Sequence, residues 1–167
     1  MQICYIINMI RFLAAIDEKR GLAKGEKLPW SIPSDVSRYQ ELMKTKGANI
    51  LVGRKTYEQM TSVLDGLNVF IATRSYNPTS KVIIVENVKD FLRGYDLNKD
   101  IWVIGGAKVF EEALEFADEL WLTEIEGDYD CDVFFPEYKD TFVLSAELEN
   151  QEEDGYKFHY RNYVSVK

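Results

Sequence analysis

The chain has 167 residues, a length that fits a single domain over residues 1–167. Hydrophobic residues make up 46% of it and charged residues 29%, a composition that excludes a disordered protein. The net charge of −8 argues against nucleic acid or an anionic membrane as partner, and a single histidine, His159, leaves little scope for a histidine-based metal site, so we expect no metal.

The N-terminal segment "MQICYIINMIRFLAAID" is apolar, but Arg11 interrupts it too early for a membrane span of about 20 residues. It also lacks the features of a signal peptide. Because Met9 is a second candidate start, residues 1–8 are interpreted as an extension of the first strand. Cys4 and Cys131 lie far apart, which favours free thiols in a reducing compartment and a cytoplasmic location.

Short β-branched runs alternate with helical patterns along the chain. Strands are expected near 2–16, 49–53, 67–73, 81–85, 100–105, 118–125, 141–149 and 156–165, and helices near 34–46, 54–61, 87–94 and 106–116. "NILVG", "KVIIV" and "IWVIGG" are continuous apolar runs, typical of strands buried on both faces. The last two strands alternate more, with "NQEEDG" as a turn between them. The pattern predicts an α/β fold whose mainly parallel sheet ends in an antiparallel hairpin.

"VIGGAKVF" places Gly105 and Gly106 between a buried strand and a helix. Glycines let a ligand approach the backbone closely, and the helix start that follows suits a pyrophosphate. A tight turn with no ligand is about as consistent with these two glycines.

Cations and hydroxyls follow two other strands. Arg54, Lys55 and Thr56 open one helix, and "ATRSYN" ends a strand at residues 73–75. Cations at a helix N-terminus are unfavourable unless an anion binds there. Because the carboxyl ends of parallel strands share one edge, we expect a phosphate-rich dinucleotide with an extra phosphate at that edge.

"GLAKGEKLPWSIPSD" contains two further candidates. Its first part is either an ordinary surface connection or a mobile loop that closes over a site. Asp35 is either a helix cap or a proton-exchanging acid, because Trp30, Ile32, Val36 and Tyr39 would surround it with apolar groups and raise its pKa. The facing of Thr123, a possible helper on a later strand, is ambiguous from the pattern.

Together, "LAAID", "LPW", "IPSD", "GRKT", "LDG", "VIGGAKVF", "LWLTEI" and "DVFFP" resemble the dihydrofolate reductase family in order and spacing, from about Ile10 to the C-terminal hairpin. The resemblance implies a sheet of eight strands flanked by about four helices. It also implies NADPH-dependent reduction of 7,8-dihydrofolate, with hydride transfer to C6 and protonation at N5, by a cytoplasmic protein that works as a monomer.

The resemblance also implies roles for individual residues. Asp35 would be the active-site acid, Thr123 would bind Asp35 and the pterin amino group, Trp30 would hold a water near Asp35, and Leu28 would lie in the lid. The remaining substrate contacts would come from Leu13, Ala14, Ala15, Tyr39, Met60 and Ile104. The cofactor would contact Ala15, Ile16, Gly53, Arg54, Lys55, Thr56, Thr73, Arg74, Ser75, Ile104, Gly105, Gly106, Ala107, Lys108, Val109 and Phe110.

One position departs from the family. Leu67, in "LDGLN", stands where the family usually has an arginine that clamps the carboxylate of the folate tail. Losing such a charged hydrogen bond costs about 1.5–3 kcal/mol of binding. This replacement favours one alternative, a reductase of the same fold acting on a related pterin or pyrimidine without the tail. A second alternative is a non-catalytic binding protein that keeps the fold; it predicts the loss of Asp35 or of the glycine turn, and the sequence retains both.

Overall fold

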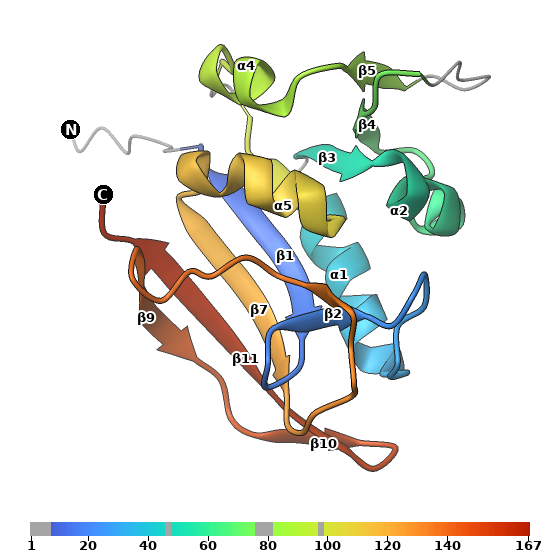
Figure 1. Ribbon diagram of the computed structural model, residues 1–167, viewed down its shortest axis with the longest axis vertical. Coiled ribbons are helices and arrows are strands. Elements are labelled where there is room, and N and C mark those ends of the chain that lie inside the picture. The colour runs from blue at the N-terminus through green and yellow to red at the C-terminus, as the bar shows by residue number, and fades with distance from the viewer. Residues whose placement is uncertain (1–7, 46–47, 76–81, 97–98) are drawn as a thin grey trace.

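A computed structural model describes residues 8–45, 48–75, 82–96 and 99–167 (Figure 1). Its centre is one mixed sheet with the strand order β10-β11-β7-β1-β6-β3-β4-β5, and β9 also pairs with β11. The strands are β1 (Ile10–Ile16), β3 (Asn49–Gly53), β4 (Asn68–Ala72), β5 (Ile83–Val85), β6 (Ile101–Val103), β7 (Glu119–Ile125), β9 (Phe142–Glu147), β10 (Gln151–Glu153) and β11 (Tyr156–Ser165).

The pairing makes the sheet mainly parallel. Strands β7, β1, β6, β3, β4 and β5 run parallel to their neighbours, whereas β11 is antiparallel to β7, β9 and β10. Because β9 and β10 pair with different ends of β11, the sheet has eight strand positions. The predicted fold class, including the C-terminal antiparallel hairpin, is confirmed.

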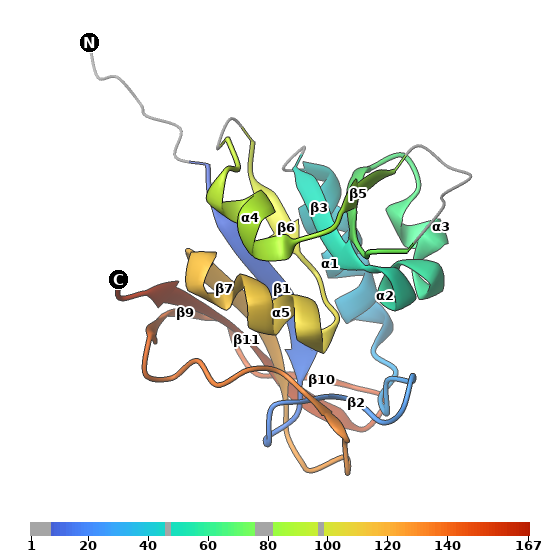
Figure 2. The same cartoon turned by 45° about the horizontal axis from the view of Figure 1, so that its top comes forward.

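Helices cover both faces of this sheet (Figures 1 and 2). They are α1 (Pro33–Thr45), α2 (Arg54–Gln59), α3 (Thr61–Leu64), α4 (Val88–Arg93) and α5 (Ala107–Ala113), which continues as the 3₁₀ turn η1 (Leu114–Phe116). One core cluster joins α4 and α5 to the sheet, and another joins Met43 of α1 and Leu64 of α3 to its other face. Neighbouring strand residues enter different clusters, as Phe12 and Leu13 do, because side chains alternate along a strand.

Several predicted boundaries need correction. The first strand begins at Ile10, after Asn8 and Met9, and the rest of the expected extension lies outside the described residues, as do residues 46 and 81. The helix expected over 54–61 is interrupted at Met60, whose φ of −120° and ψ of 18° separate α2 from α3. The helix expected over 106–116 loses its α-helical form after Ala113.

The segment interpreted as a loop before "LPW" contains a strand. Gly21–Ala23 forms β2, which pairs antiparallel with β8 (Val133–Phe134) in a separate two-stranded sheet. Asp17 fixes the turn before β2, because its carboxylate accepts hydrogen bonds from the backbone N–H groups of Lys19, Gly21 and Tyr129. The base of this segment is therefore held by backbone pairing.

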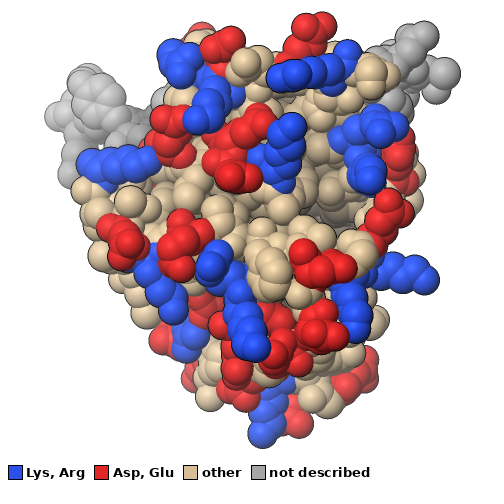
Figure 3. Space-filling view, in the orientation of Figure 1, with Lys and Arg blue, Asp and Glu red and all other residues tan. Residues whose placement is uncertain are grey.

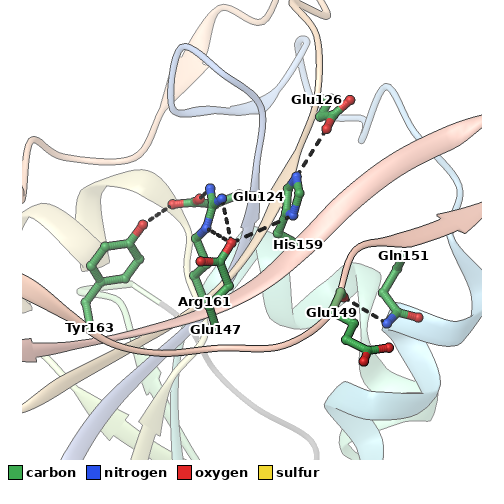
Figure 4. Close-up of polar contacts among 8 residues, drawn as sticks. All are labelled: Glu124, Glu126, Glu147, Glu149, Gln151, His159, Arg161 and Tyr163. Atoms are coloured by element: carbon green, nitrogen blue, oxygen red, sulfur yellow. Dashed lines mark hydrogen bonds and ion pairs between the residues drawn. The ribbon is translucent and has the colours of Figure 1, made fainter.

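The turn predicted at "NQEEDG" is wrong over Gln151–Glu153, which form β10. The chain turns instead at Asp154 and Gly155, whose φ angles of 51° and 83° are left-handed. Beside this hairpin, Arg161 lies between Glu124 and Glu147, and Tyr163 also donates to Glu124 (Figure 4). These contacts tie β9 and β11 to β7.

The charged side chains do not sort into one sign on the face drawn in Figure 3, where Lys and Arg lie among Asp and Glu. Ion pairs such as Lys19–Asp128 and Lys89–Glu115, at 2.7 and 2.8 Å, reflect this mixing. Of the helices in the described ranges, none combines the length and apolar character needed to cross a membrane.

Candidate active site

A cavity of about 840 Å³ opens beside the carboxyl ends of β1 and β6. Three groups of predicted residues line it: Leu13, Ala14 and Ala15 from β1, Ile104, Gly105 and Gly106 after β6, and Asp35 and Tyr39 from α1. The other predicted residues in its lining are Leu28, Trp30, Lys55, Thr56, Met60, Ala107 and Phe110. One cavity thus unites predicted residues from Leu13 to Phe110.

Asp35 is the buried carboxyl group of this cavity, with only 6% of its surface exposed. Its Oδ1 accepts a 2.6 Å hydrogen bond from the hydroxyl of Thr123, which is itself buried. Burial is the largest influence on Asp35 and raises its pKa, while the Thr123 hydrogen bond lowers it. A carboxyl group balanced in this way holds its proton to a higher pH than an exposed aspartate.

The start of α1 explains why Asp35 is free to face the cavity. The backbone N–H of Ser34 donates to Glu153 of β10 at 3.3 Å, and the Ser34 hydroxyl also donates to Glu153. Glu153 thereby takes over part of the capping of α1, and the side-chain hydrogen bond of Asp35 goes to Thr123 of β7. Thr123 therefore faces α1, which settles the orientation that the sequence pattern left open.

The apolar wall predicted for Asp35 lines the same cavity, with Val36 49% exposed; its members are Trp30, Ile32, Val36 and Tyr39. Trp30 is buried and packs edge-on against Tyr129, with ring centroids 5.6 Å apart. Leu28, at the other extreme, is 62% exposed although it lines the cavity. The cavity therefore has a fixed wall at Trp30 and an exposed apolar rim at Leu28.

The glycine turn meets the end of β3 at close range. The Gly53 N–H donates to the Gly105 carbonyl at 2.7 Å. A Cβ on Gly53 would lie 3.3 Å from Val109 Cγ2, and a Cβ on Gly106 would lie 3.3 Å from Thr56 Oγ1. Gly105 has a φ of 116°, which a residue with a side chain rarely adopts. The two strand ends thus present nearly bare backbone beside the cavity.

The remaining predicted cofactor residues lie outside the cavity lining. Arg54 and Lys108 are exposed, and each is weakly paired to a glutamate one helical turn away, at 3.7 and 3.9 Å. Thr73 follows β4, where its N–H donates to Val85, and its hydroxyl accepts a hydrogen bond from the Ser75 N–H. The others outside the lining are Ile16, Gly53, Arg74 and Val109. Their role in cofactor binding stays a prediction.

Sequence reasoning missed several lining residues: Leu22, Ala23, Gly25, Glu26, Ser31, Pro33, Gln59, Val63 and Val133. Most lie on β2, β8, α2 or α3 or beside them, elements too short to show a hydrophobic period. Within the described ranges, no group of three or more His, Cys, Asp or Glu side chains could hold a metal ion.

Comparisons with known proteins agree on one family. The family profile for dihydrofolate reductase matches residues 9–165. A dihydrofolate reductase from Bacillus subtilis (strain 168) is 38% identical over 52 residues, a match that spans 31% of this chain and only 30% of that relative. The solved structure of a dihydrofolate reductase from Enterococcus faecalis, complexed with NADP(H) and RAB-propyl, superposes with a TM-score of 0.81 at 26% identity, over 95% of this chain and 97% of that chain. The family predicted from the sequence motifs is confirmed, and the chain belongs to the dihydrofolate reductase family.

Proposed function

We propose that this protein catalyses the NADPH-dependent reduction of 7,8-dihydrofolate to 5,6,7,8-tetrahydrofolate, with Asp35 as its active-site acid. The observation that carries the proposal is the carboxyl group of Asp35, buried in the cavity and hydrogen-bonded to Thr123. Reduction of a C=N bond requires a proton on nitrogen, and a carboxyl group with a raised pKa retains a proton nearer to neutral pH.

Asp35 would perform two tasks. Its carboxylate matches the paired N–H donors of a pterin ring, N3 and the 2-amino group, which would fix the ring in one orientation. Its protonated form would support protonation at N5. Thr123 would hold the carboxyl group in place, Trp30 would position a water near it, and Tyr39 and Met60 would pack against the ring.

The residues present fit a dinucleotide cofactor. A Cβ on Gly53, Gly105 or Gly106 would lie 3.3 Å from Val109, Phe110 or Thr56, so glycines allow the two strand ends to pack closely together. The backbone of Gly105 and Gly106 lines the cavity, and the phosphate groups would lie against it. Arg54, Lys55 and Arg74 would neutralise the phosphates, with hydroxyls from Thr56, Thr73 and Ser75. NADPH, when bound, supplies the hydride for C6. The protein aligns the two ligands and excludes water, and Leu28 at the exposed rim would cover both.

The cavity offers few groups that could bind the carboxylate of the substrate's glutamate tail. Leu67 is half-buried against the core cluster that includes Leu64, and it does not line the cavity. Among the described residues that line the cavity, Lys55 is the only cation, and it is paired with Glu26 at 3.4 Å. We therefore infer that the pterin ring is recognised more strongly than the tail carboxylate.

The test follows NADPH oxidation with dihydrofolate and, in parallel, with dihydropteroate, which lacks the glutamate tail. Turnover of both substrates, with similar KM values, is expected. Tight NADPH binding without turnover of dihydrofolate would refute the proposed function. Turnover of dihydropteroate alone would favour the alternative of a substrate without the tail.

We also propose that the protein works as a monomer, because one chain supplies the whole cavity. Its cytoplasmic location stays a prediction.

A further inference from the structure

Arg38 lies on α1 one helical turn after Asp35, outside the cavity lining. Its guanidinium carbon is 3.9 Å from the centre of the Tyr160 ring and 5.9 Å from that of Trp121. A guanidinium group on an aromatic face is held by electrostatic attraction to the ring as well as by packing. The positive charge of Arg38 is thus held over the Tyr160 ring at a partly buried position.

The sheet register brings these residues together. Tyr160 of β11 lies directly opposite Thr123 of β7, so their side chains share one face of the sheet. Trp121, two residues before Thr123, lies on the same face. Positions i and i+3 of a helix also share a face, so Asp35 meets Thr123 while Arg38 meets Tyr160. Two neighbouring pairs therefore join α1 to the sheet.

The guanidinium group of Arg38 forms no ion pair with the described residues. Within the described part of the chain, no carboxylate lies within ion-pairing distance of Arg38, and its buried Nη1 has no hydrogen-bond partner there. Burial lowers the pKa of Arg38, and the nearby Tyr160 and Asp35 raise it. The field of this charge is therefore available to Asp35.

Asp35 lies between charges of opposite sign. Arg38 lowers the pKa of Asp35, and Glu153, which accepts from Ser34 at the start of α1, raises it. The other titratable groups facing Asp35 are the phenols of Tyr39 on α1 and Tyr160 on β11, and burial raises the pKa of each. Phenols of this kind stay neutral near pH 7, so Arg38 and Glu153 carry the charges next to Asp35.

We propose that Arg38 is a positioning residue whose charge, fixed on the Tyr160 ring, stabilises the ionised form of Asp35 from outside the cavity lining. Arg38 does not line the cavity and acts only through Asp35. Its effect on the reaction rests on the proposed function, but its effect on the carboxyl group does not. Glu153 acts on the same carboxyl group in the opposite direction.

The direct test is the titration of Asp35, followed by ¹³C NMR of protein labelled at the aspartate carboxyl carbons, with Asp35→Asn to assign the signal. Arg38→Gln is expected to move the Asp35 midpoint to higher pH, and Glu153→Gln to move it to lower pH. Arg38→Lys, which keeps the charge and loses the planar stacking, is expected to fall between the wild type and Arg38→Gln. A merely structural disturbance would not give opposite shifts in two variants.

An Asp35 midpoint in Arg38→Gln that is unchanged, or lower than in the wild type, would overturn the proposal. If Arg38→Gln does not fold, Arg38→Met keeps the aliphatic stem on the Tyr160 ring and carries the same expectation. The pH profile of kcat/KM for dihydrofolate separates the two proposals. Its alkaline limb should move with the Asp35 midpoint; a midpoint that moves while the limb stays would support the Arg38 inference and refute the proposed role of Asp35.

Discussion

The hydroxyl of Thr123 donates a 2.6 Å hydrogen bond to the carboxylate of Asp35, across 88 residues of sequence. Both side chains are buried, so this hydrogen bond has little competition from water. It fixes the start of α1 against β7, next to the end of β1. The orientation of the candidate acid therefore depends on the packing of helix α1 on the sheet. This packing holds the side chain more firmly than a surface loop would.

Asp35→Asn is expected to keep NADPH binding and to lose about 100- to 10,000-fold in turnover at neutral pH, the usual range for removing a general acid. The amide keeps the shape of the side chain but cannot exchange the proton. Steady-state kinetics and NADPH fluorescence titration measure the two properties. Asp140→Asn, at an exposed turn, is the control. Near-normal turnover in Asp35→Asn would refute the role assigned to Asp35.

The same substitution should increase stability at neutral pH. The pKa of Asp35 is raised above its ordinary value of 3.8 in the folded protein, so the folded state binds this proton more tightly than the unfolded chain. The resulting stability is complete below 3.8 and is lost as the pH rises through the folded-state pKa. Urea unfolding should show Asp35→Asn more stable than the wild type at pH 7, with a gain that shrinks toward pH 4. A gain independent of pH would contradict this explanation.

Thr123→Val removes the hydroxyl at nearly constant volume. Because the hydrogen bond lowers the pKa of Asp35, the alkaline limb of the activity profile should move to higher pH. Stability should fall by about 1–3 kcal/mol, the cost of a lost buried hydrogen bond. Thr141→Val, whose hydroxyl contacts the Tyr138 carbonyl far from the cavity, should leave the pH profile unchanged. An unshifted profile in Thr123→Val would mean that this bond does not influence the acid.

Leu67→Arg should lower the KM for dihydrofolate by roughly tenfold or more, the value of a charged hydrogen bond to the tail carboxylate. The KM for dihydropteroate, which lacks that carboxylate, should not change. Leu67→Gln provides a polar control without charge. If the arginine variant keeps the wild-type KM for dihydrofolate, another residue holds the tail.

Glu124→Gln should destabilise the C-terminal hairpin by about 1.5–3 kcal/mol, because Glu124 accepts hydrogen bonds from Tyr138 and, as Figure 4 shows, from Tyr163 and Arg161. Glu126→Gln is the matched control: the Glu126 side chain is half exposed and its carboxylate contacts His159, so its loss should cost about 0.5 kcal/mol or less. Urea unfolding of both variants checks the difference. Equal losses would show that the network around Glu124 contributes little.

Apolar runs were sufficient to predict the central strands β3 and β6, which are buried on both faces. The same interpretation was wrong for "KVIIV", because its strand β5 lies at the edge of the sheet and Ile83 is 50% exposed. The small sheet of β2 and β8 was missed because strands of three and two residues have no readable period. Asp35 was found through the order of the motifs around it. The Arg38–Tyr160 contact could not be predicted, because it depends on the register of β11 against β7.

The two ends of the sheet also bear on aggregation. One end of the sheet is the three-residue strand β5. The other end consists of two separate strands, β9 and β10, which pair with different parts of β11. A long, exposed and unpaired strand edge is a template for pairing with another chain. Short and divided edges give a second molecule little template for strand addition, so the sheet can keep many parallel strands without inviting fibre growth at either end.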